Sequence, residues 1–479
     1  MVRADELALI PAIELIALMR SRTVSPVEVI ESARAAHDAF NPSLNAIVTE
    51  TFDAAMEEAR RAERQLTLDE DVGPLHGLPL AVKDSIETAG VRTTYGSPLF
   101  RDHVPPSDAL HVARLRAAGA ILVGKTNTPE FEAGINTRNP LFGQSLNPWN
   151  VDLGCGGSSG GSAVALATGM CALADGTDHG GSIRIPASVT GVVGLRPSPG
   201  RVPLHPSTWV FDPFGVPGPL ARSARDVALM LSVMAGPDAR VPISLADQGT
   251  ALVDPSRTAR SCRVAWTPDL GGLFAVDPEV ARVAEAAARR FTDLGCAVER
   301  ASPDWNDARE IIEPLRAFRT AIVTEGLRER GDGPSNPFLQ EFMERAARMP
   351  LIDVAHAEHR RSAYWERTAA FFSRFDLLVL PATQWTAFPK DQEFPPMVGG
   401  RAMGGTVEAI LATYAVTIAG LPALSIPCGL TSKELPVGLQ IVGGWRADAE
   451  VLRAGIALED LLRFSRRPPI VAPANRLAG

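Results

Sequence analysis

Residues 154–186 constrain the fold of this chain more than any other stretch, because glycine and serine are concentrated there in two knots. The first knot is GGSSGG at 156–161, and the second is GGS at 180–182. Glycine lacks a Cβ atom, so such segments can adopt left-handed backbone and let several amide N–H groups converge on one point. An apolar, alanine-rich segment of helical character separates the knots. The run therefore predicts two tight turns around a helix, with one hydroxyl in each turn, Ser158 and Ser182.

Acyl transfer requires a hydroxyl nucleophile beside converging N–H donors. The hydroxyl oxygen attacks the carbonyl carbon, and the N–H groups stabilise the oxyanion that develops. A flexible linker and a generic phosphate-binding loop are the alternatives. A linker is disfavoured, because the run continues into SIRIP at 182–186 and a strand-like apolar stretch at 189–195. We therefore interpret the run as a site.

Size and charge narrow the class of protein. A chain of 479 residues, 46% of them hydrophobic, can bury a large core. The net charge is −8 and no basic cluster stands out, so neither nucleic acid nor an anionic membrane is expected as a partner. No apolar stretch approaches the ~20 residues of a membrane span. The start of the chain, with Arg3 followed by Asp5 and Glu6, has no signal-peptide pattern, which favours a cytoplasmic protein.

Metal and disulfide chemistry is not expected from the cysteines and histidines. The cysteines are odd in number, scattered and without a C-x-x-C pair, which predicts reduced thiols and no zinc site. His356 and His359 have helical i, i+3 spacing that could hold a metal, but no third ligand is evident, so a solvated helix face is preferred. We therefore expect no cofactor and no metal. The five cysteines are Cys155, Cys171, Cys262, Cys296 and Cys428.

The pattern of apolar residues predicts an α/β fold. The N-terminal part is helical, and its first helix begins at a capping box formed by Ser25 and Glu28. A strand at 262–266, a helix at 277–294 and a strand at 297–298 form a βαβ unit, which implies parallel pairing. The other expected helices are 25–40, 51–65, 305–375 with a break at 331–337, and 447–463; the other expected strands are 78–82, 120–123, 377–380, 424–426 and 437–442.

Residues 119–126, GAILVGKT, match the phosphate-loop pattern G-x-x-x-x-G-K-T. That loop needs a strand before its first glycine and a helix after its last residue. Here the four middle residues are themselves apolar and strand-like, and Asn-Thr-Pro follows. Nucleotide binding at 119–126 is therefore a disfavoured alternative.

Several ordered blocks together resemble the amidase signature family. They are 73–84 (GPLHGLPLAVKD), 124–131 (GKTNTPEF), 147–149 (NPW), 156–162 (GGSSGGS), 176–184 (GTDHGGSIR), 419–423 (AGLPA) and 435–440 (LPVGLQ). The resemblance spans about 25–464 and thins between 302 and 375. It implies one α/β domain over 1–479, a large mixed twisted sheet between helices. Its parts would be a helical layer at 1–65, the catalytic core at 73–225, a variable helical insert at 305–375 and C-terminal strands and a helix at 376–470.

Carried over by position, the resemblance implies a Lys–Ser–Ser catalytic set. Ser182 would be the nucleophile, Ser158, in a cis peptide, would relay the proton, and Lys83 would be the base. The oxyanion would be held by the backbone N–H groups of His179, Gly180, Gly181 and Ser182. Histidine at 179 departs from the family, which usually carries threonine or an aliphatic residue there. Its imidazole would line the pocket or face solvent.

A lysine acts as a base only when it is neutral, and its reference pKa is ~10.4. Bringing that pKa near 7 requires a shift of roughly 3 units, or about 4 kcal/mol, through burial. The apolar run at 78–82, directly before Lys83, is suited to such burial.

The substrate is predicted less directly. The family's glutaminase subunit binds the α-amino and carboxylate groups of glutamine with an acidic and a basic residue, and the segment 406–417 lacks the expected aspartate. Loop aromatics instead favour an apolar or aryl amide, anilide or carbamate, with ester cleavage as a side activity. The alternatives are a non-catalytic member of a larger complex and a glutamine-hydrolysing amidotransferase subunit. A homodimer through 305–375 is a further expectation. The expected substrate-binding residues are Glu132, Gly134, Gly157, Trp209 and Trp385.

Overall fold

The computed structural model describes residues 7–247, 262–329 and 333–471. Residues 1–6, on which the signal-peptide argument rests, and the first two residues of the expected break at 331–337 lie outside these ranges. Within them, no helix is both long and apolar enough to cross a bilayer.

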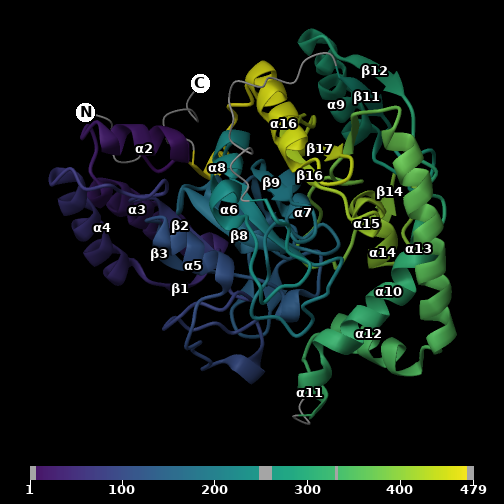
Figure 1. The fold of residues 1–479 in the computed structure, drawn as a ribbon, viewed down its shortest axis with the longest axis horizontal. Helices are drawn as coiled ribbons and strands as arrows, with labels where there is room; N and C mark the ends of the chain where they lie inside the picture. Colours follow the sequence, from purple (N-terminus) through teal and green to yellow (C-terminus); the bar gives the residue numbers. More distant parts are fainter. Residues whose placement is uncertain (1–6, 248–261, 330–332, 472–479) are drawn as a thin grey trace.

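A mixed sheet of eleven strands forms the centre of the described structure (Figure 1). The two ends of the sheet contain parallel pairs, and an antiparallel series joins them. This confirms the predicted α/β class with a large mixed sheet. In spatial order the strands are β1 (Ile47–Glu50), β3 (Ile121–Thr126), β2 (Pro79–Lys83), β8 (Leu173–Asp178), β10 (Val216–Ala221), β9 (Val193–Arg196), β16 (Ala423–Leu430), β17 (Pro436–Gly443), β13 (Leu377–Pro381), β11 (Arg263–Trp266) and β12 (Ala297–Arg300).

Helices cover both faces of the sheet because successive strand residues point to opposite sides. In β2, Leu80 and Val82 join the core with α5, α8 and α16, whereas Ala81 joins the core with α4 and α6. The helices are α2 (Ala12–Arg20), α3 (Pro26–Leu44), α4 (Phe52–Thr67), α5 (Leu110–Ala117), α6 (Gly160–Ala167), α7 (Arg184–Thr190), α8 (Ala224–Met234), α9 (Pro278–Arg289), α10 (Ala308–Val323), α11 (Glu325–Glu329), α12 (Pro337–Arg348), α13 (Leu351–Phe372), α14 (Thr406–Ala409), α15 (Leu411–Ile418) and α16 (Asp448–Leu462).

Several predicted element ends differ from the structure, two of them for a clear local reason. The capping box at Ser25 and Glu28 is present, but α3 continues past Asn41 to Leu44 with Pro42 inside it. Pro42 lacks the N–H that would bind the carbonyl of residue 38. The Asn41 side chain accepts the N–H groups of Ala46 and Ile47 and donates to the Ile47 carbonyl, which orders the chain after the helix. The apolar stretch at 189–195 is not a single strand. Val189 lies inside α7, and strand β9 begins at residue 193.

The predicted βαβ unit is confirmed, but the prediction for its cysteines is wrong. Strands β11 and β12 pair in parallel, with Arg263 opposite Ala297. The residues just before them, Cys262 and Cys296, therefore lie side by side and form a disulfide. Cys155, Cys171 and Cys428 are free thiols, as expected.

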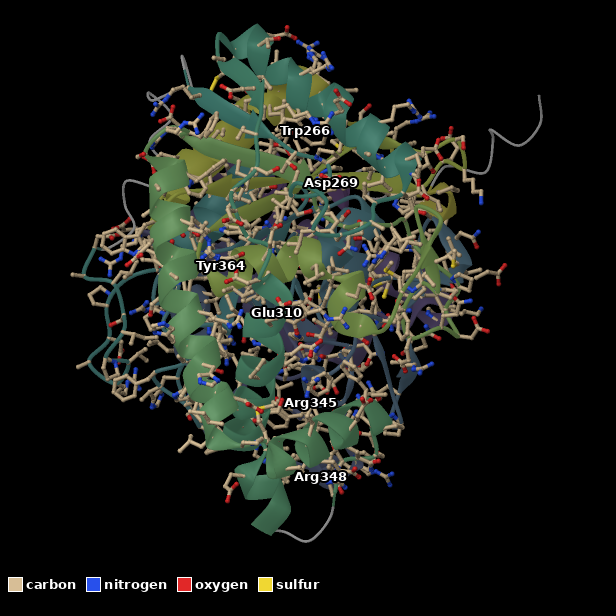
Figure 2. All side chains as sticks on the ribbon, turned by 90° about the vertical axis from the view of Figure 1, so that its right-hand side faces the viewer. Trp266, Asp269, Glu310, Arg345, Arg348 and Tyr364 are labelled. Atoms are coloured by element: carbon tan, nitrogen blue, oxygen red, sulfur yellow. A yellow bond between two sulfur atoms is a disulfide. The ribbon has the colours of Figure 1, made fainter. Side chains whose placement is uncertain are left out.

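Helices α10 to α13 form a layer at one end of the molecule, with α13 along its outer edge (Figures 1 and 2). Trp305 stacks on Tyr364 of α13 and donates its indole N–H to Thr368. The Tyr364 hydroxyl, labelled in Figure 2, donates to the Ala415 carbonyl of α15 at 2.9 Å. These contacts fix α13 against α15 and against the segment that leads into α10.

The phosphate-loop alternative is wrong. Gly124, Lys125 and Thr126 lie within strand β3, so the segment cannot curl around a phosphate. The Lys125 ammonium is buried and donates to the Ile86 carbonyl and to the Thr88 and Thr93 hydroxyls. It is therefore a structural residue.

Candidate active site

The sheet brings Lys83 to the sequence-predicted serines. Strands β2 and β8 are parallel neighbours, so their carboxyl ends meet at one edge of the sheet. Lys83 ends β2, and its Nζ donates to the Ser158 Oγ at 2.6 Å and to the Thr177 Oγ1 of β8 at 2.8 Å. The ammonium is fully buried. The apolar run before Lys83 supplies that burial, as the sequence predicts.

The two glycine-serine knots lie against each other. The Gly157–Ser158 peptide is cis, and the Ser159 N–H directly after it donates to the Ser182 carbonyl at 3.0 Å. Ser182 follows the end of β8 and lines a cavity together with Gly157 and Thr177. The structure therefore places Lys83 and Ser158 in direct contact and Ser182 on the adjoining segment.

Glu132 is the charged neighbour of Lys83. Its Oε1 lies 3.0 Å from the Lys83 Nζ and accepts hydrogen bonds from Ser85 and Thr177. Burial lowers the pKa of Lys83, and Glu132 opposes this shift by stabilising the ammonium. Burial alone would raise the pKa of Glu132, but Lys83 and the two hydroxyls outweigh it and bring that pKa to about 2. Glu132 thus sets how readily Lys83 becomes neutral.

Asp178 organises the turn that carries Ser182. Its carboxylate accepts the backbone N–H groups of Gly181, Ile183 and Arg184. Gly181 has φ +110°, and a Cβ atom there would lie 2.6 Å from the Thr413 hydroxyl, so the turn requires glycine. The Gly181 N–H therefore serves Asp178, and Gly181 does not line the cavity, whereas the other three expected oxyanion-hole residues do.

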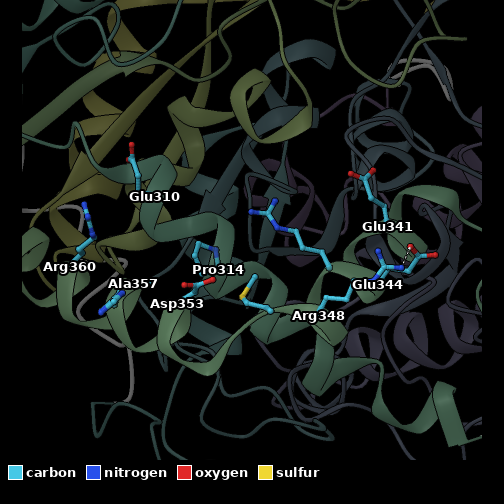
Figure 3. A pocket seen from close by; sticks show the side chains of 11 residues that line it. Glu310, Pro314, Glu341, Glu344, Arg348, Asp353, Ala357 and Arg360 are labelled. Carbon is cyan, nitrogen blue, oxygen red and sulfur yellow. Dashed lines mark ion pairs between the residues drawn. The ribbon is translucent and has the colours of Figure 1, made fainter.

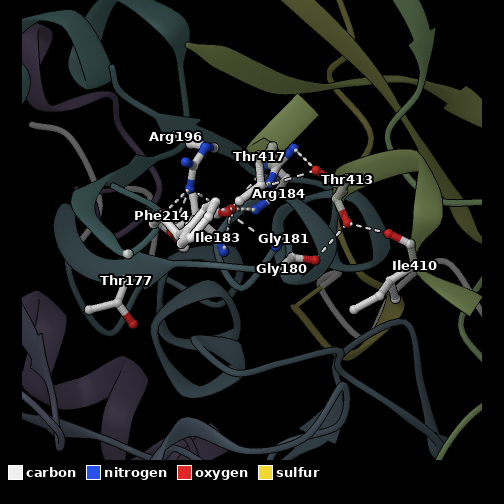
Figure 4. Close-up of polar contacts among 12 residues, drawn as sticks. Thr177, Gly180, Gly181, Ile183, Arg184, Arg196, Phe214, Ile410, Thr413 and Thr417 are labelled. Atoms are coloured by element: carbon white, nitrogen blue, oxygen red, sulfur yellow. Dashed lines mark hydrogen bonds and ion pairs between the residues drawn. The ribbon is translucent and has the colours of Figure 1, made fainter. Parts of the chain in front are cut away.

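Two arginines hold Asp178 in its ionised form. Arg184 donates to both carboxylate oxygens, at 2.7 and 3.0 Å, and Arg196 contacts the same group; all three side chains are fully buried. Arg184 also binds Thr413 and Thr417, which tie the turn to α15 (Figure 4). Burial favours the protonated acid, but the arginines lower the pKa of Asp178 far below its ordinary value.

Asp178→Asn should lower the free energy of unfolding by about 3–5 kcal/mol, because two buried guanidinium groups lose their counter-charge. The pKa of Asp178 is depressed in the fold, so its stabilising contribution is present at neutral pH and is lost as pH falls below ~4. Urea unfolding of the variant at pH 7 measures the effect. Asp152→Asn, at an exposed position, is the matched control. A loss below about 1 kcal/mol would contradict the role assigned to Asp178.

The cavity in front of Ser182 has an apolar wall and a cationic end. Of the expected substrate-binding residues, Glu132, Gly134 and Gly157 line it, and Trp209 and Trp385 do not. Trp209 packs edge-on against Phe318. Trp385 is buried and donates its indole N–H to the Ala409 carbonyl, so it supports the helix behind the cavity. The apolar wall is made by Phe131, Ile185, Leu204, Val323, Phe338, Leu339, Phe342 and Ile410.

A second, larger hollow lies on the surface between α10, α12 and α13 (Figure 3). Charged side chains line it, among them Glu310, Arg345 and Arg348, which Figure 2 shows on the same side of the molecule. His356 lies there, but none of the predicted catalytic residues does. Across the described ranges, no three His, Cys, Asp or Glu side chains gather in a way that could hold a metal ion.

Several residues of the site have no signal in the sequence. Thr177, the second acceptor for Lys83, lies within the second signature block but looks like an ordinary strand residue. Arg316, Arg319 and Tyr414 reach the cavity from α10 and α15, which are more than 100 residues away along the chain from Ser182. Only the packing of α10 against α15 and α12 brings them there.

Comparison with known proteins shows the family of this chain. The family model "Amidase" matches residues 28–452. An acylamidase of Rhodococcus erythropolis is 36% identical over 96% of both chains, and a glutamyl-tRNA(Gln) amidotransferase subunit of Synechococcus sp. is 35% identical over 94% of this chain and 96% of the relative. The crystal structure of a bacterial aryl acylamidase of the amidase signature family superposes with a TM-score of 0.89 at 30% identity, covering 97% of this chain and 98% of that one. The chain therefore belongs to the amidase signature family and is an amidase, a hydrolase of carbon–nitrogen amide bonds.

Proposed function

We propose that this amidase hydrolyses apolar or aryl amides, anilides or carbamates through an acyl-enzyme on Ser182, with ester cleavage as a side activity. The observation that carries the mechanism is the 2.6 Å contact between the Lys83 Nζ and the Ser158 Oγ, beside the segment that presents Ser182 to the cavity. The apolar wall of that cavity supports the substrate class. The likeness to an acylamidase and an aryl acylamidase supports it further.

In the proposed cycle the Ser182 hydroxyl attacks the amide carbonyl while its proton passes to Ser158, whose own proton passes to neutral Lys83. The tetrahedral oxyanion is held by backbone N–H groups of His179, Gly180 and Ser182. The Lys83 ammonium then returns a proton through Ser158 to the leaving nitrogen, and the C–N bond breaks. Water repeats these steps on the acyl-enzyme and releases the acid and the free Ser182.

Glu132→Gln should move the acid limb of the pH profile of kcat/KM to lower pH by about 1–3 units. Lys83 must be neutral to accept a proton, and the Glu132 carboxylate stabilises its ammonium. Removing that negative charge lowers the pKa of Lys83, so the neutral base persists at lower pH. The more distant Asp175 and Asp178 charges stay in place. Profiles measured between pH 5 and 10 test this, with the surface variant Glu393→Gln as control. An unchanged or raised acid limb would contradict the arrangement.

Glutamine hydrolysis is the second candidate, because several relatives are subunits of glutamyl-tRNA(Gln) amidotransferases. The segment 406–417, which lacks the expected aspartate, contributes Ile410 and Tyr414 to the cavity. The acids that line the cavity, Glu132 and Asp178, are already paired with Lys83 and with the two arginines. The α-ammonium of glutamine therefore lacks a free carboxylate, which disfavours this substrate.

A turnover panel separates these functions. It compares a 4-nitroanilide, a primary amide, a urethane, a phenyl ester and glutamine, with Lys83→Ala as the inactive control. We expect release of nitroaniline and no release of ammonia from glutamine. Hydrolysis of glutamine alone would replace the proposal, and no turnover of any substrate would favour a non-catalytic role in a complex. The homodimer through 305–375 stays a prediction.

A further inference from the structure

The cavity in front of Ser182 contains a cation, Arg316, that has no ion-pair partner among the described residues. Arg316 projects from α10, and its guanidinium carbon lies 3.9 Å from the centre of the Phe342 ring and 4.8 Å from that of Phe338. Its Nη1 atom is buried and has no hydrogen-bond partner among the described residues. Arginine keeps its charge even in such surroundings. Arg316 is half-buried as a residue, and its buried Nη1–H donors are costly unless an acceptor meets them.

The other charges at the cavity are already compensated. Glu132 is paired with Lys83, and Asp178 with Arg184 and Arg196. Arg319, one turn along α10 from Arg316, donates to Asp212 at 2.7 Å. Within the described lining, Arg316 is therefore the charge that lacks a partner, and it makes that end of the cavity cationic.

A second residue of the lining, His179, also carries an atom without a partner among the described residues. The Nε2 of His179 is buried without a hydrogen-bond partner in the described structure. Its ring lies edge-on to Tyr414, with centroids 5.7 Å apart, and the Arg316 guanidinium carbon is also 5.7 Å from the centroid of the Tyr414 ring. Burial, followed by the charges of Arg319 and Arg316, lowers the pKa of His179 well below its ordinary value, so the imidazole is neutral. In its Nε2–H form the imidazole is a hydrogen-bond donor.

We propose that Arg316, assisted by the His179 side chain, binds a carboxylate carried by the substrate, so that the enzyme prefers amides in which an apolar or aryl body ends in a carboxylate. This deepens the proposed function and rests on it. The aromatic wall takes the body, and Arg316 takes the charged end through charge-assisted hydrogen bonds. The unpaired positive charge of Arg316 disfavours an additional ammonium group on the substrate, which separates this class from free amino acids.

The carboxylate can belong to the acyl side or to the amine side, and paired substrates distinguish them. For the acyl side, the mono-4-nitroanilide of glutaric acid is compared with the 4-nitroanilide of pentanoic acid. For the amine side, 4-acetamidobenzoate is compared with 4-methylacetanilide. We expect the carboxylate member of one pair to have a kcat/KM roughly 10- to 100-fold higher than its neutral partner. That preference should disappear in Arg316→Met and return in part in Arg316→Lys.

A matched control and a binding measurement complete the test. Arg309→Met changes an exposed arginine of the same helix and should leave the preference intact. Calorimetry measures the binding of 4-phenylbutyrate to the inactive variant Ser182→Ala. Binding to the double variant Ser182→Ala/Arg316→Met should be at least tenfold weaker. Turnover of the neutral anilides with no carboxylate preference, or equal binding of 4-phenylbutyrate by both proteins, would overturn this inference and leave the proposed function standing. Binding of 4-phenylbutyrate that depends on Arg316, without turnover of any amide, would support the carboxylate site and refute the proposed function.

Discussion

Ser182→Ala should reduce anilide turnover by about 10⁴- to 10⁶-fold, because the chain then lacks the oxygen that forms the acyl bond. Ser182 lines the cavity, and removing one hydroxyl there takes away no described hydrogen bond, so the thermal unfolding midpoint should stay close to that of the wild type. Release of nitroaniline from a 4-nitroanilide measures the loss.

The matched control for this variant is Ser188→Ala. Ser188 is a buried serine six residues further along the chain and outside the cavity. Its hydroxyl accepts the Gly438 N–H and shares a hydrogen bond with the Thr383 hydroxyl. The Ser188 variant should keep turnover within a few-fold of the wild type at a temperature where it is folded. Substantial residual turnover in Ser182→Ala, or an acyl adduct found by mass spectrometry on another residue, would refute the nucleophile assignment.

Lys83→Met should reduce kcat by about 10³- to 10⁴-fold, since the relay from Ser182 through Ser158 then ends without a base. The variant also leaves Glu132 without its cation, which destabilises the fold. The double variant Lys83→Met/Glu132→Gln restores the charge balance. It should therefore regain stability and stay inactive, which separates catalysis from folding. Turnover measured together with urea unfolding gives both values.

Lys125→Met provides the matched lysine control. Lys125 is equally buried, in the strand next to Lys83, but its ammonium contacts Ile86, Thr88 and Thr93 and no catalytic residue. This variant should lose stability and keep the chemical step. Equal losses of kcat in the two lysine variants under folded conditions would mean that Lys83 acts through structure alone.

The parts of the site that the sequence could predict are those encoded locally. The glycine-serine knots determine two turns whatever surrounds them, because their backbone needs residues without a Cβ atom, as the positive φ of Gly181 shows. Lys83 follows an unbroken apolar run, so its burial could be read directly from the chain. The argument against a phosphate loop at 119–126 was also local, because the residues between its two glycines are apolar and strand-like. Strand β3 does run through this segment.

The remainder depends on contacts between distant segments. Arg316 lies in a helical stretch whose polar and apolar pattern indicates only an amphipathic helix, and its place in the cavity is decided by the packing of α10 against α12 and α15. Trp385 is an aromatic residue of the kind that lines apolar binding sites, but its indole N–H donates to the Ala409 carbonyl. The disulfide could have been inferred, because the βαβ prediction already placed Cys262 and Cys296 directly before paired strands.

The pH dependence of labelling by a fluorophosphonate tests the central claim most directly, because it reports the activation of Ser182 without a leaving amine. We expect an adduct on Ser182 whose rate of formation rises through one ionisation below the ordinary pKa of lysine. The midpoint should fall further in Glu132→Gln, and Lys83→Met should show almost no labelling. Labelling of Lys83→Met at the wild-type rate and with the wild-type pH dependence would contradict the central claim.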